Sequence, residues 1–217
     1  MVSDADRAAE DAIAELIRHE RPDDALLGEE GTAAGGSSGR RWVVDPLDGT
    51  TNYLYGLPVW AVSVAVEDAD GGVAGVVLDP TRDELFAAAR AEGATLGGAP
   101  IRVREGTPLG ESLIATGFAY GAAQRAEQAR VLQHVLPRVR DVRRAGAAAI
   151  DLAWVAAGRL DGYFERGLNP WDWAAGRLLV AEAGGAVADL RGEPAGLVAA
   201  GSSLAGELMA LVTQAES

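Results

Sequence analysis

The chain has 217 residues and no cysteine, and its 19 Lys and Arg against 32 Asp and Glu give a formal charge of −13. With 48% hydrophobic and 24% charged residues, the composition is typical of a globular protein and excludes a disordered or fibrous one. The lack of cysteine excludes disulfides, thiolate zinc sites and a cysteine nucleophile, and the acidity argues against nucleic acid as a partner.

The N-terminal residues 1–6 are acidic and lack the apolar stretch of a secretory signal peptide. No uninterrupted apolar run approaches the roughly 18 residues that a membrane span needs. The sequence therefore predicts a cytoplasmic protein with no membrane partner.

The first half of the chain predicts one helix followed by short strands. Ser3 or Asp4 caps the helix, and Pro22 follows its end. Its expected apolar face consists of Ala9, Ile13, Leu16 and Ile17. The expected strands are 41–45, 59–66, 72–78, 84–89, 95–96 and 101–103, the last two joined by a Gly-Gly hairpin turn.

The second half alternates expected strands with expected helices. The strands are 112–116, 141–144, 163–164 and 197–200, and the helices are 124–136, 148–157, 170–184 and 203–214. Asn169 and Pro170 give the third of these helices a cap and a favourable first residue. Without a long linker, the pattern predicts a single domain over residues 1–217, with an α+β half at 1–110 and an α/β half at 111–217.

The most informative segment is residues 42–52, which read WVVDPLDGTTN. The proline after Asp45 keeps that residue extended at the end of its strand, and the turn that follows brings Asp48 near it. Two carboxylates and the freed Leu47 carbonyl are hard oxygen ligands of the kind that Mg²⁺ prefers. Backbone N–H groups from Thr50 onward would bind an anion beside the metal. For Asp45 and its proline alone, a side-chain-capped turn is the alternative interpretation.

This segment resembles the first motif of the inositol monophosphatase family, whose members are Mg²⁺-dependent, lithium-sensitive phosphomonoesterases. A second family motif is similar to residues 169–176 (NPWDWAAG), with EAGG at 182–185, and residues 28–30 match the acidic pair before the first motif. The resemblance covers the chain from about Asp6 to its C-terminus. It implies an α/β (α+β) fold, a layered αβαβα sandwich of the inositol monophosphatase and fructose-1,6-bisphosphatase type, and a homodimer.

The resemblance also implies the metal ligands, with two or three Mg²⁺ ions in each active site. Glu29, Asp45 and the Leu47 carbonyl would hold the first ion. Asp45, Asp48 and Asp172 would hold the second, and Glu29 would reach a third, weakly held ion through water.

The catalytic group implied by the resemblance is Thr50, Asp6 and Glu29, with Thr50 positioning the attacking water and Asp6 orienting Thr50. The backbone N–H groups of Gly49 and Thr50 would hold the phosphate. The full set of implied substrate contacts is Asp48, Gly49, Thr50, Gly146, Ala147, Ala148, Glu165 and Asp172.

The implied reaction is in-line attack of a metal-activated water on inositol 1-phosphate or a similar polyol or sugar monophosphate. Histidinol phosphate and fructose 1,6-bisphosphate are alternative substrates, although Lys at the Thr51 position is common among relatives that hydrolyse histidinol phosphate. A binding or regulatory protein that keeps the fold without turnover is the alternative from another class. The chain also lacks the helical sequence that family members carry before Asp6, so we expect Ile13, Leu16 and Ile17 to be bare without a dimer partner.

Overall fold

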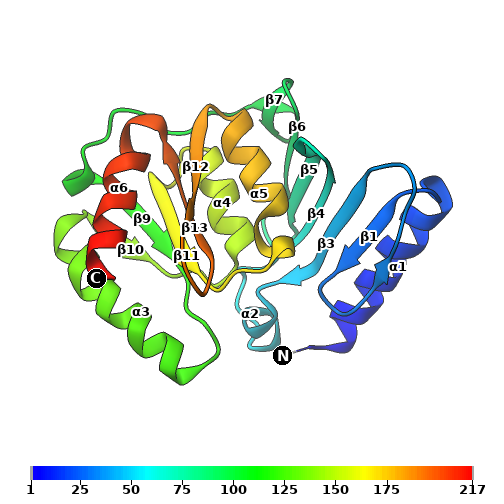
Figure 1. Ribbon diagram of the computed structural model, residues 1–217, viewed down its shortest axis with the longest axis horizontal. Coiled ribbons are helices and arrows are strands. Elements are labelled where there is room, and N and C mark those ends of the chain that lie inside the picture. The colour runs from blue at the N-terminus through cyan, green and yellow to red at the C-terminus, as the bar shows by residue number, and fades with distance from the viewer. Residues whose placement is uncertain (1, 217) are drawn as a thin grey trace.

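The computed structural model describes residues 2–216 as two mixed β-sheets layered with helices (Figure 1). The strands of the first sheet are β1 (Ala25–Gly28), β2 (Ala33–Ala34), β3 (Arg41–Asp48), β4 (Ala61–Asp68), β5 (Gly71–Asp79), β6 (Glu84–Ala89), β7 (Gly93–Leu96) and β8 (Ala99–Pro100). Their spatial order is β2-β1-β3-β4-β5-β6-β7-β8. The strands of the second sheet are β9 (Leu113–Thr116), β10 (Asp141–Arg143), β11 (Gly162–Arg166), β12 (Gly185–Leu190) and β13 (Gly196–Gly201), in the order β10-β9-β11-β13-β12.

Six α-helices complete this described part of the chain, together with 3₁₀ turns at Leu109–Glu111 and Leu136–Arg138. The helices are α1 (Asp4–Glu20), α2 (Thr50–Leu54), α3 (Ala122–Val135), α4 (Ala148–Ala156), α5 (Pro170–Glu182) and α6 (Ser202–Ala215). Within residues 2–216, no helix combines the length and the apolar character that crossing a membrane requires.

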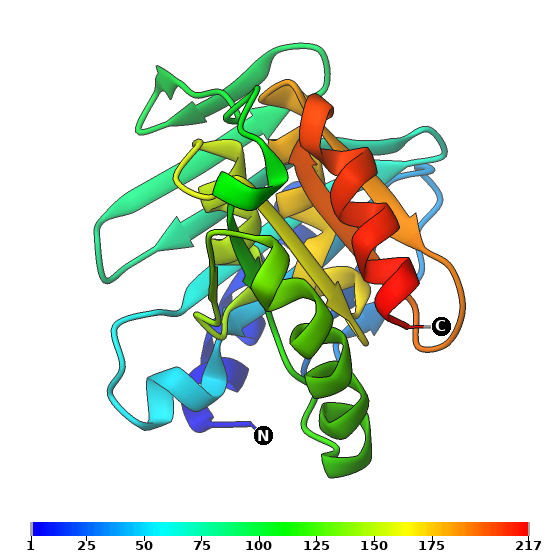
Figure 2. The same cartoon turned by 90° about the vertical axis from the view of Figure 1, so that its left-hand side faces the viewer.

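The layers follow the order αβαβα, which confirms the expected fold class. Helix α1 packs on the outer face of the first sheet, α4 and α5 lie between the sheets, and α3 and α6 cover the outer face of the second (Figures 1 and 2). Strand β3 contributes side chains to the cores on both faces of the first sheet, because successive side chains of a strand point to opposite faces. Val43 packs in the core between the sheets, and Val44 packs with Ala14 and Ile17 of α1.

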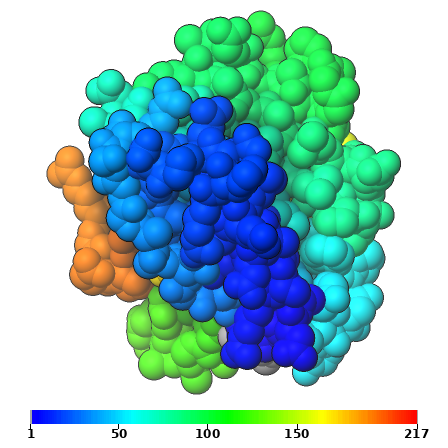
Figure 3. All heavy atoms as spheres, turned by 90° about the vertical axis from the view of Figure 1, so that its right-hand side faces the viewer, coloured from blue at the N-terminus to red at the C-terminus, as the bar shows by residue number. Residues whose placement is uncertain are grey.

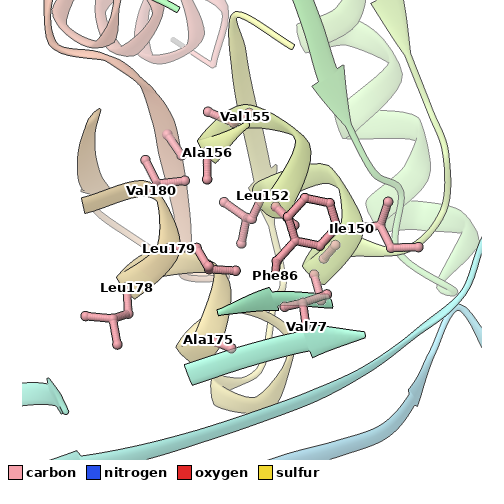
Figure 4. Packing of buried hydrophobic residues seen from close by; sticks show 14 of the residues in the cluster. Val77, Phe86, Ile150, Leu152, Val155, Ala156, Ala175, Leu178, Leu179 and Val180 are labelled. Carbon is pink, nitrogen blue, oxygen red and sulfur yellow. The ribbon is translucent and has the colours of Figure 1, made fainter. Parts of the chain in front are cut away.

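The main core lies between the first sheet and helices α4 and α5. Figure 4 shows Phe86 and Val77 of the sheet beside Leu152 of α4 and Leu179 of α5. The two helices approach closely at Gly176, where a Cβ atom would lie 2.5 Å from Leu152 Cβ. Glycine is therefore required there, and the tight helix pair fixes the start of α5 relative to that of α4.

The structure corrects several expected boundaries. Strands β1, β2 and β12 were not predicted, and β3 continues to Asp48 instead of ending at Asp45. Residues 101–103 form no strand; the Ile101 N–H donates to the Ala94 carbonyl at 3.0 Å, and the Val103 N–H donates at 3.1 Å to the carbonyl of Ala183, which caps the end of α5. The Gly97-Gly98 turn joins β7 to β8 through the pairs Thr95–Pro100 and Leu96–Ala99, so the expected hairpin is confirmed, and its second strand lies two residues earlier than predicted.

The expected apolar face of α1 is confirmed for Ile13 and Ile17, which pack in the cluster beneath the helix, and is wrong for Leu16. Ser3 caps the helix as predicted, but of the expected face only Ile17 is buried, and Leu16 is 62% exposed. Asp6 and Glu10 are buried instead, at 0% and 3% exposure. The apolar face is thus confined to the later turns of α1, and its first turns present carboxylates to the interior. Of the three residues that were expected to be bare (Ile13, Leu16 and Ile17), only Leu16 is exposed.

Candidate metal and phosphate site

Strand β3 ends in an irregularity that carries the acidic pair. Asp45 pairs with Ser63 and Asp48 with Ala61 of β4, and the register shifts between these two pairs. Bulges of this kind redirect side chains and are frequent beside active sites. Asp45 and Asp48 are 1% and 8% exposed, so both carboxylates lie in the interior. The turn expected after Asp45 instead falls at Gly49.

Gly49 makes the sharp turn from β3 into α2. Its φ of 92° lies in the left-handed region, and a Cβ atom there would lie 3.0 Å from the Val59 carbonyl oxygen and 3.3 Å from Ala147 Cβ. Only glycine combines this φ with such close neighbours at low cost. The turn places Thr50 as the first residue of α2, as predicted.

Thr50 and Asp6 meet although they are far apart in sequence. Thr50 Oγ1 lies 3.1 Å from Asp6 Oδ1 and 3.2 Å from the Leu47 carbonyl oxygen, so its hydroxyl donates to one of these acceptors. Asp6 Oδ2 in turn accepts the Ser3 N–H at 2.8 Å within the cap of α1. Figure 3 shows the first turn of α1 (blue) beside the α2 segment (cyan). The helix cap therefore fixes the carboxylate that contacts Thr50.

Glu29 and Asp172 join the acidic pair from two other elements. Glu29 follows β1, where its N–H donates to the Val44 carbonyl at 3.1 Å, and its carboxyl group shares a hydrogen bond with that of Asp45. Asp172 lies in the first turn of α5, where its Oδ2 accepts the Asn169 N–H at 2.6 Å. Glu29, Asp45, Asp48 and Asp172 thus form an acidic cluster built from β1, β3 and α5.

The members of the acidic cluster have raised pKa values, mainly because their carboxyl groups are buried. Burial raises the pKa of Glu29 to about 7 and that of Asp172 to about 6. Burial, followed by neighbouring carboxylates, holds the pKa values of Asp45 and Asp48 well above the usual range. Among the described residues, the charges that act most strongly on these two are all negative. The cluster lacks a protein counter-charge of matching strength, which is the electrostatic condition that a bound cation relieves.

The chemistry of the acidic cluster fits a hard cation. Its donors are carboxylate oxygens together with the Leu47 carbonyl, which suit Mg²⁺ better than soft metals. Within residues 2–216, no three acidic or histidine side chains already converge in the arrangement of a metal site. The carboxyl groups of Glu29 and Asp45 lie close enough to interact through a hydrogen bond.

The start of α4 closes another side of the acidic cluster. Asp48 Oδ2 accepts the Ala149 N–H at 2.6 Å. Asn52 Nδ2 donates to the carbonyls of Val59 at 2.8 Å and Ala145 at 2.9 Å, so α2 is tied to the turn before α4. The structure therefore brings Gly146, Ala147 and Ala148, the expected substrate contacts, beside Asp48 and Gly49.

A second group of polar side chains, which was not predicted apart from Glu165, lies behind the acidic cluster. Tyr163 donates its hydroxyl to Glu165 Oε2 at 2.6 Å, and burial raises the pKa of Glu165 to about 7. Burial and then Glu165 also raise the pKa of Asp151, whose Oδ1 has no hydrogen-bond partner. One sequence signal could have identified Asp151, because it is the only charged residue in an otherwise apolar helix, α4.

The sequence profile of the inositol monophosphatase family matches residues 1–217. This chain belongs to the inositol monophosphatase family. It is 46% identical over 193 residues to a protein of Salmonella typhimurium named Nus factor SuhB, covering 88% of this chain and 72% of that protein. It is 47% identical to the inositol-1-monophosphatase of Rhizobium meliloti, covering 88% and 73%. The crystal structure of the extragenic suppressor protein suhB from Bartonella henselae superposes with a TM-score of 0.92 at 41% identity, covering 98% of this chain and 86% of that one.

This inositol monophosphatase family member is expected to gain stability without metal as the pH falls from about 8 to about 5. Glu29, Glu165 and Asp172 have folded pKa values above their ordinary range, so the folded state takes up protons that the unfolded chain still releases. The cost of burying their charges is therefore relieved as the pH falls through these values.

Thermal unfolding in the presence of a chelator measures this effect. Each kcal/mol gained raises the midpoint by about 2–4 °C in a chain of this size. Carboxylates with lowered pKa values, such as Asp68, stabilise the folded state at these pH values and lose that contribution to stability only at more acidic pH. Saturating Mg²⁺ is expected to raise the midpoint mainly at the alkaline end. A midpoint that stays level or falls between about pH 8 and about pH 5 would count against the raised pKa values.

Proposed function

We propose that this protein is a Mg²⁺-dependent phosphomonoesterase that acts on inositol 1-phosphate or a similar polyol or sugar monophosphate. The acidic cluster carries this proposal, because buried carboxylates without a matching basic partner are costly unless a cation joins them. Family membership and 47% identity to a protein named inositol-1-monophosphatase support the same reaction.

The proposed ligands divide into two sets that share Asp45. Glu29, Asp45 and the Leu47 carbonyl would hold one ion, and Asp45, Asp48 and Asp172 would hold another. Mg²⁺ at these positions would offset the charge of the phosphate and lower the pKa of water. The ligand sets draw on β1, β3 and α5, so folding of the whole chain assembles them.

Thr50 and Asp6 are proposed to orient the attacking water. When the Thr50 hydroxyl donates a hydrogen bond to Asp6, the lone pairs of the Thr50 oxygen are free to accept a hydrogen bond from water. Asp6, fixed by the cap of α1, is then able to receive a proton through Thr50. The N–H groups of Gly49 and Thr50 would hold the phosphate. Attack in line with the leaving oxygen needs no covalent phosphoenzyme.

The polyol part of the substrate is proposed to contact Glu165 and the turn formed by Gly146, Ala147 and Ala148. Asp48 accepts the N–H of the next residue, Ala149, at 2.6 Å, which holds this turn against the acidic cluster. Because Ala147 has no hydroxyl group, its contribution there is limited to shape and backbone.

Phosphate release tests the proposed function. The assay compares inositol 1-phosphate, histidinol phosphate and fructose 1,6-bisphosphate, each with Mg²⁺ and with a chelator. We expect Mg²⁺-dependent release with inositol 1-phosphate or another polyol monophosphate as the best substrate. A higher kcat/KM for histidinol phosphate or the bisphosphate would overturn the substrate class. No release from any of them by the folded protein would overturn the enzymatic proposal.

A second candidate function is regulation through a protein partner. It is favoured by the 46% identity to proteins named Nus factor SuhB. This candidate predicts a folded protein that forms a complex and needs no turnover to do so. A variant that no longer releases phosphate distinguishes the two candidates. The regulatory function predicts that this variant still binds its partner. The expected homodimer remains a prediction, which the native mass in solution tests.

A further inference from the structure

Helix α1 turns two carboxylates inward, one helical turn apart, and only the first has a role so far. Asp6 contacts Thr50, whereas Glu10 is 3% exposed and contacts a different segment. Glu10 Oε2 accepts the Glu30 N–H at 2.9 Å, and Oε1 accepts the Thr32 N–H at 2.9 Å. Both oxygens of this buried carboxyl group therefore have hydrogen-bond donors, and the same short segment supplies them.

That segment is the tight turn between β1 and β2, and it begins with Glu29. The turn passes through Gly31, whose φ is 109°, and closes where the Gly28 N–H donates to the Thr32 carbonyl at 2.7 Å. On one side it is attached to β3 by the bond from the Glu29 N–H to the Val44 carbonyl. On the other side its bonds to the helix layer are those to Glu10.

Gly28 leaves the space that the Glu10 carboxylate occupies. A Cβ atom at position 28 would lie 2.4 Å from Glu10 Oε2 and 2.8 Å from Oε1. Real Cβ atoms essentially never come so close, so a larger residue would displace the carboxylate. Gly28 and Glu10 therefore form one contact that substitution from either side would break.

We propose that Glu10 is a positioning residue that fixes the turn 29–32 so that the Glu29 carboxylate faces Asp45, and that it thereby sets the affinity of the acidic cluster for Mg²⁺. Glu10 itself would touch neither metal nor substrate. The proposal rests on the proposed function for the identity of the ion. The alternative is that Glu10 only stabilises the fold and leaves the metal affinity unchanged.

Glu10→Gln is the sharpest variant because it keeps the size of the side chain. The amide offers one acceptor oxygen, and its NH₂ group would face an N–H donor of the turn, so one of the two hydrogen bonds is lost. Glu15→Gln is the matched control, since it removes the same charge from the exposed side of the same helix. Gly28→Ala tests the contact from the other side.

Calorimetric titration of the full chain with Mg²⁺ provides the decisive comparison. We expect Glu10→Gln and Gly28→Ala to weaken Mg²⁺ binding about tenfold or more, as is usual when a partner behind a metal ligand is removed. Glu15→Gln is expected to match wild type. Amide hydrogen exchange at Glu30 and Thr32 is expected to speed up in the first two variants alone. In the phosphate assay, the Mg²⁺ concentration for half-maximal rate is expected to rise while kcat at saturating Mg²⁺ changes little.

Wild-type affinity for Mg²⁺ in both Glu10→Gln and Gly28→Ala, together with a lower unfolding midpoint, would overturn the proposal and leave Glu10 a purely structural residue. Calorimetry records binding without turnover. A tenfold loss of affinity in a protein that hydrolyses no phosphate would therefore support the role of Glu10 and contradict only the proposed function.

Discussion

Replacing Asp45 with Asn is expected to lower Mg²⁺-dependent phosphate release about a thousand-fold or more. Asp45 is shared by both proposed ligand sets and is 1% exposed. Asn keeps the shape of the side chain and its acceptor for the Leu47 N–H, but it removes the charge that would hold both ions. A loss of about 4 kcal/mol in transition-state stabilisation corresponds to roughly a thousand-fold in rate. The phosphate assay at saturating substrate measures it.

The same substitution is expected to leave the metal-free protein as stable as wild type or more stable. Burial and the charges of Asp48 and Glu29 disfavour an ionised Asp45, so a neutral side chain relieves that repulsion. Thermal unfolding with a chelator therefore separates lost chemistry from lost folding. Asp11→Asn, which changes an exposed acid on α1, is the control and is expected to behave as wild type. More than about a tenth of wild-type activity in Asp45→Asn would contradict the shared-ligand assignment.

Phe86→Ala is expected to have the largest effect on stability. Phe86 is 0% exposed and lies between the first sheet and the α4–α5 pair (Figure 4). Truncation would remove the ring and leave a cavity, at a cost of about 3–5 kcal/mol. It would also remove the ring over which the Arg159 guanidinium lies, at 5.7 Å from its centroid. The unfolding midpoint is expected to fall by roughly 10 °C.

Phe86→Leu provides the control for that cavity. Leu fills much of the space, so the expected loss is about 1.5 kcal/mol or less. Differential scanning calorimetry of the two variants beside wild type measures the difference. Equal midpoints for Phe86→Ala and wild type would mean that this core does not carry the packing between the first sheet and its helices.

Local patterns predicted most elements of the fold, but some strands have no local signal. β6 was predicted with its observed bounds, and the cap at Asn169 gave the start of α5, because alternation and caps are visible within a few residues. β1 and β2 are too short for an alternation to show. β12 lies at the edge of its sheet, and most of its residues are half-buried, so its faces do not alternate clearly.

In the candidate site, too, groups that lie close in sequence could be predicted from local patterns, whereas contacts between distant segments could not. Asp45, Leu47 and Asp48 are close in sequence, so the residues alone indicated a cation site. The pairing of Thr50 with Asp6 came only from the family resemblance, since it joins segments 44 residues apart. Glu10 was missed because an acid on a helix is usually solvated, and its bonds to the turn at Glu30 span 20 residues. Its burial depends on how α1 packs on the sheet.

Anomalous diffraction from crystals grown with Mn²⁺ and inorganic phosphate tests whether the acidic cluster holds two metal ions. Mn²⁺ takes the same oxygen ligands as Mg²⁺ and is visible by its anomalous signal. We expect one peak between Glu29 and Asp45, near the Leu47 carbonyl. We expect a second peak among Asp45, Asp48 and Asp172, about 4 Å from the first. Crystals that show phosphate or Mn²⁺ elsewhere, with no peak at these carboxylates, would contradict the assignment of two metal ions to the acidic cluster.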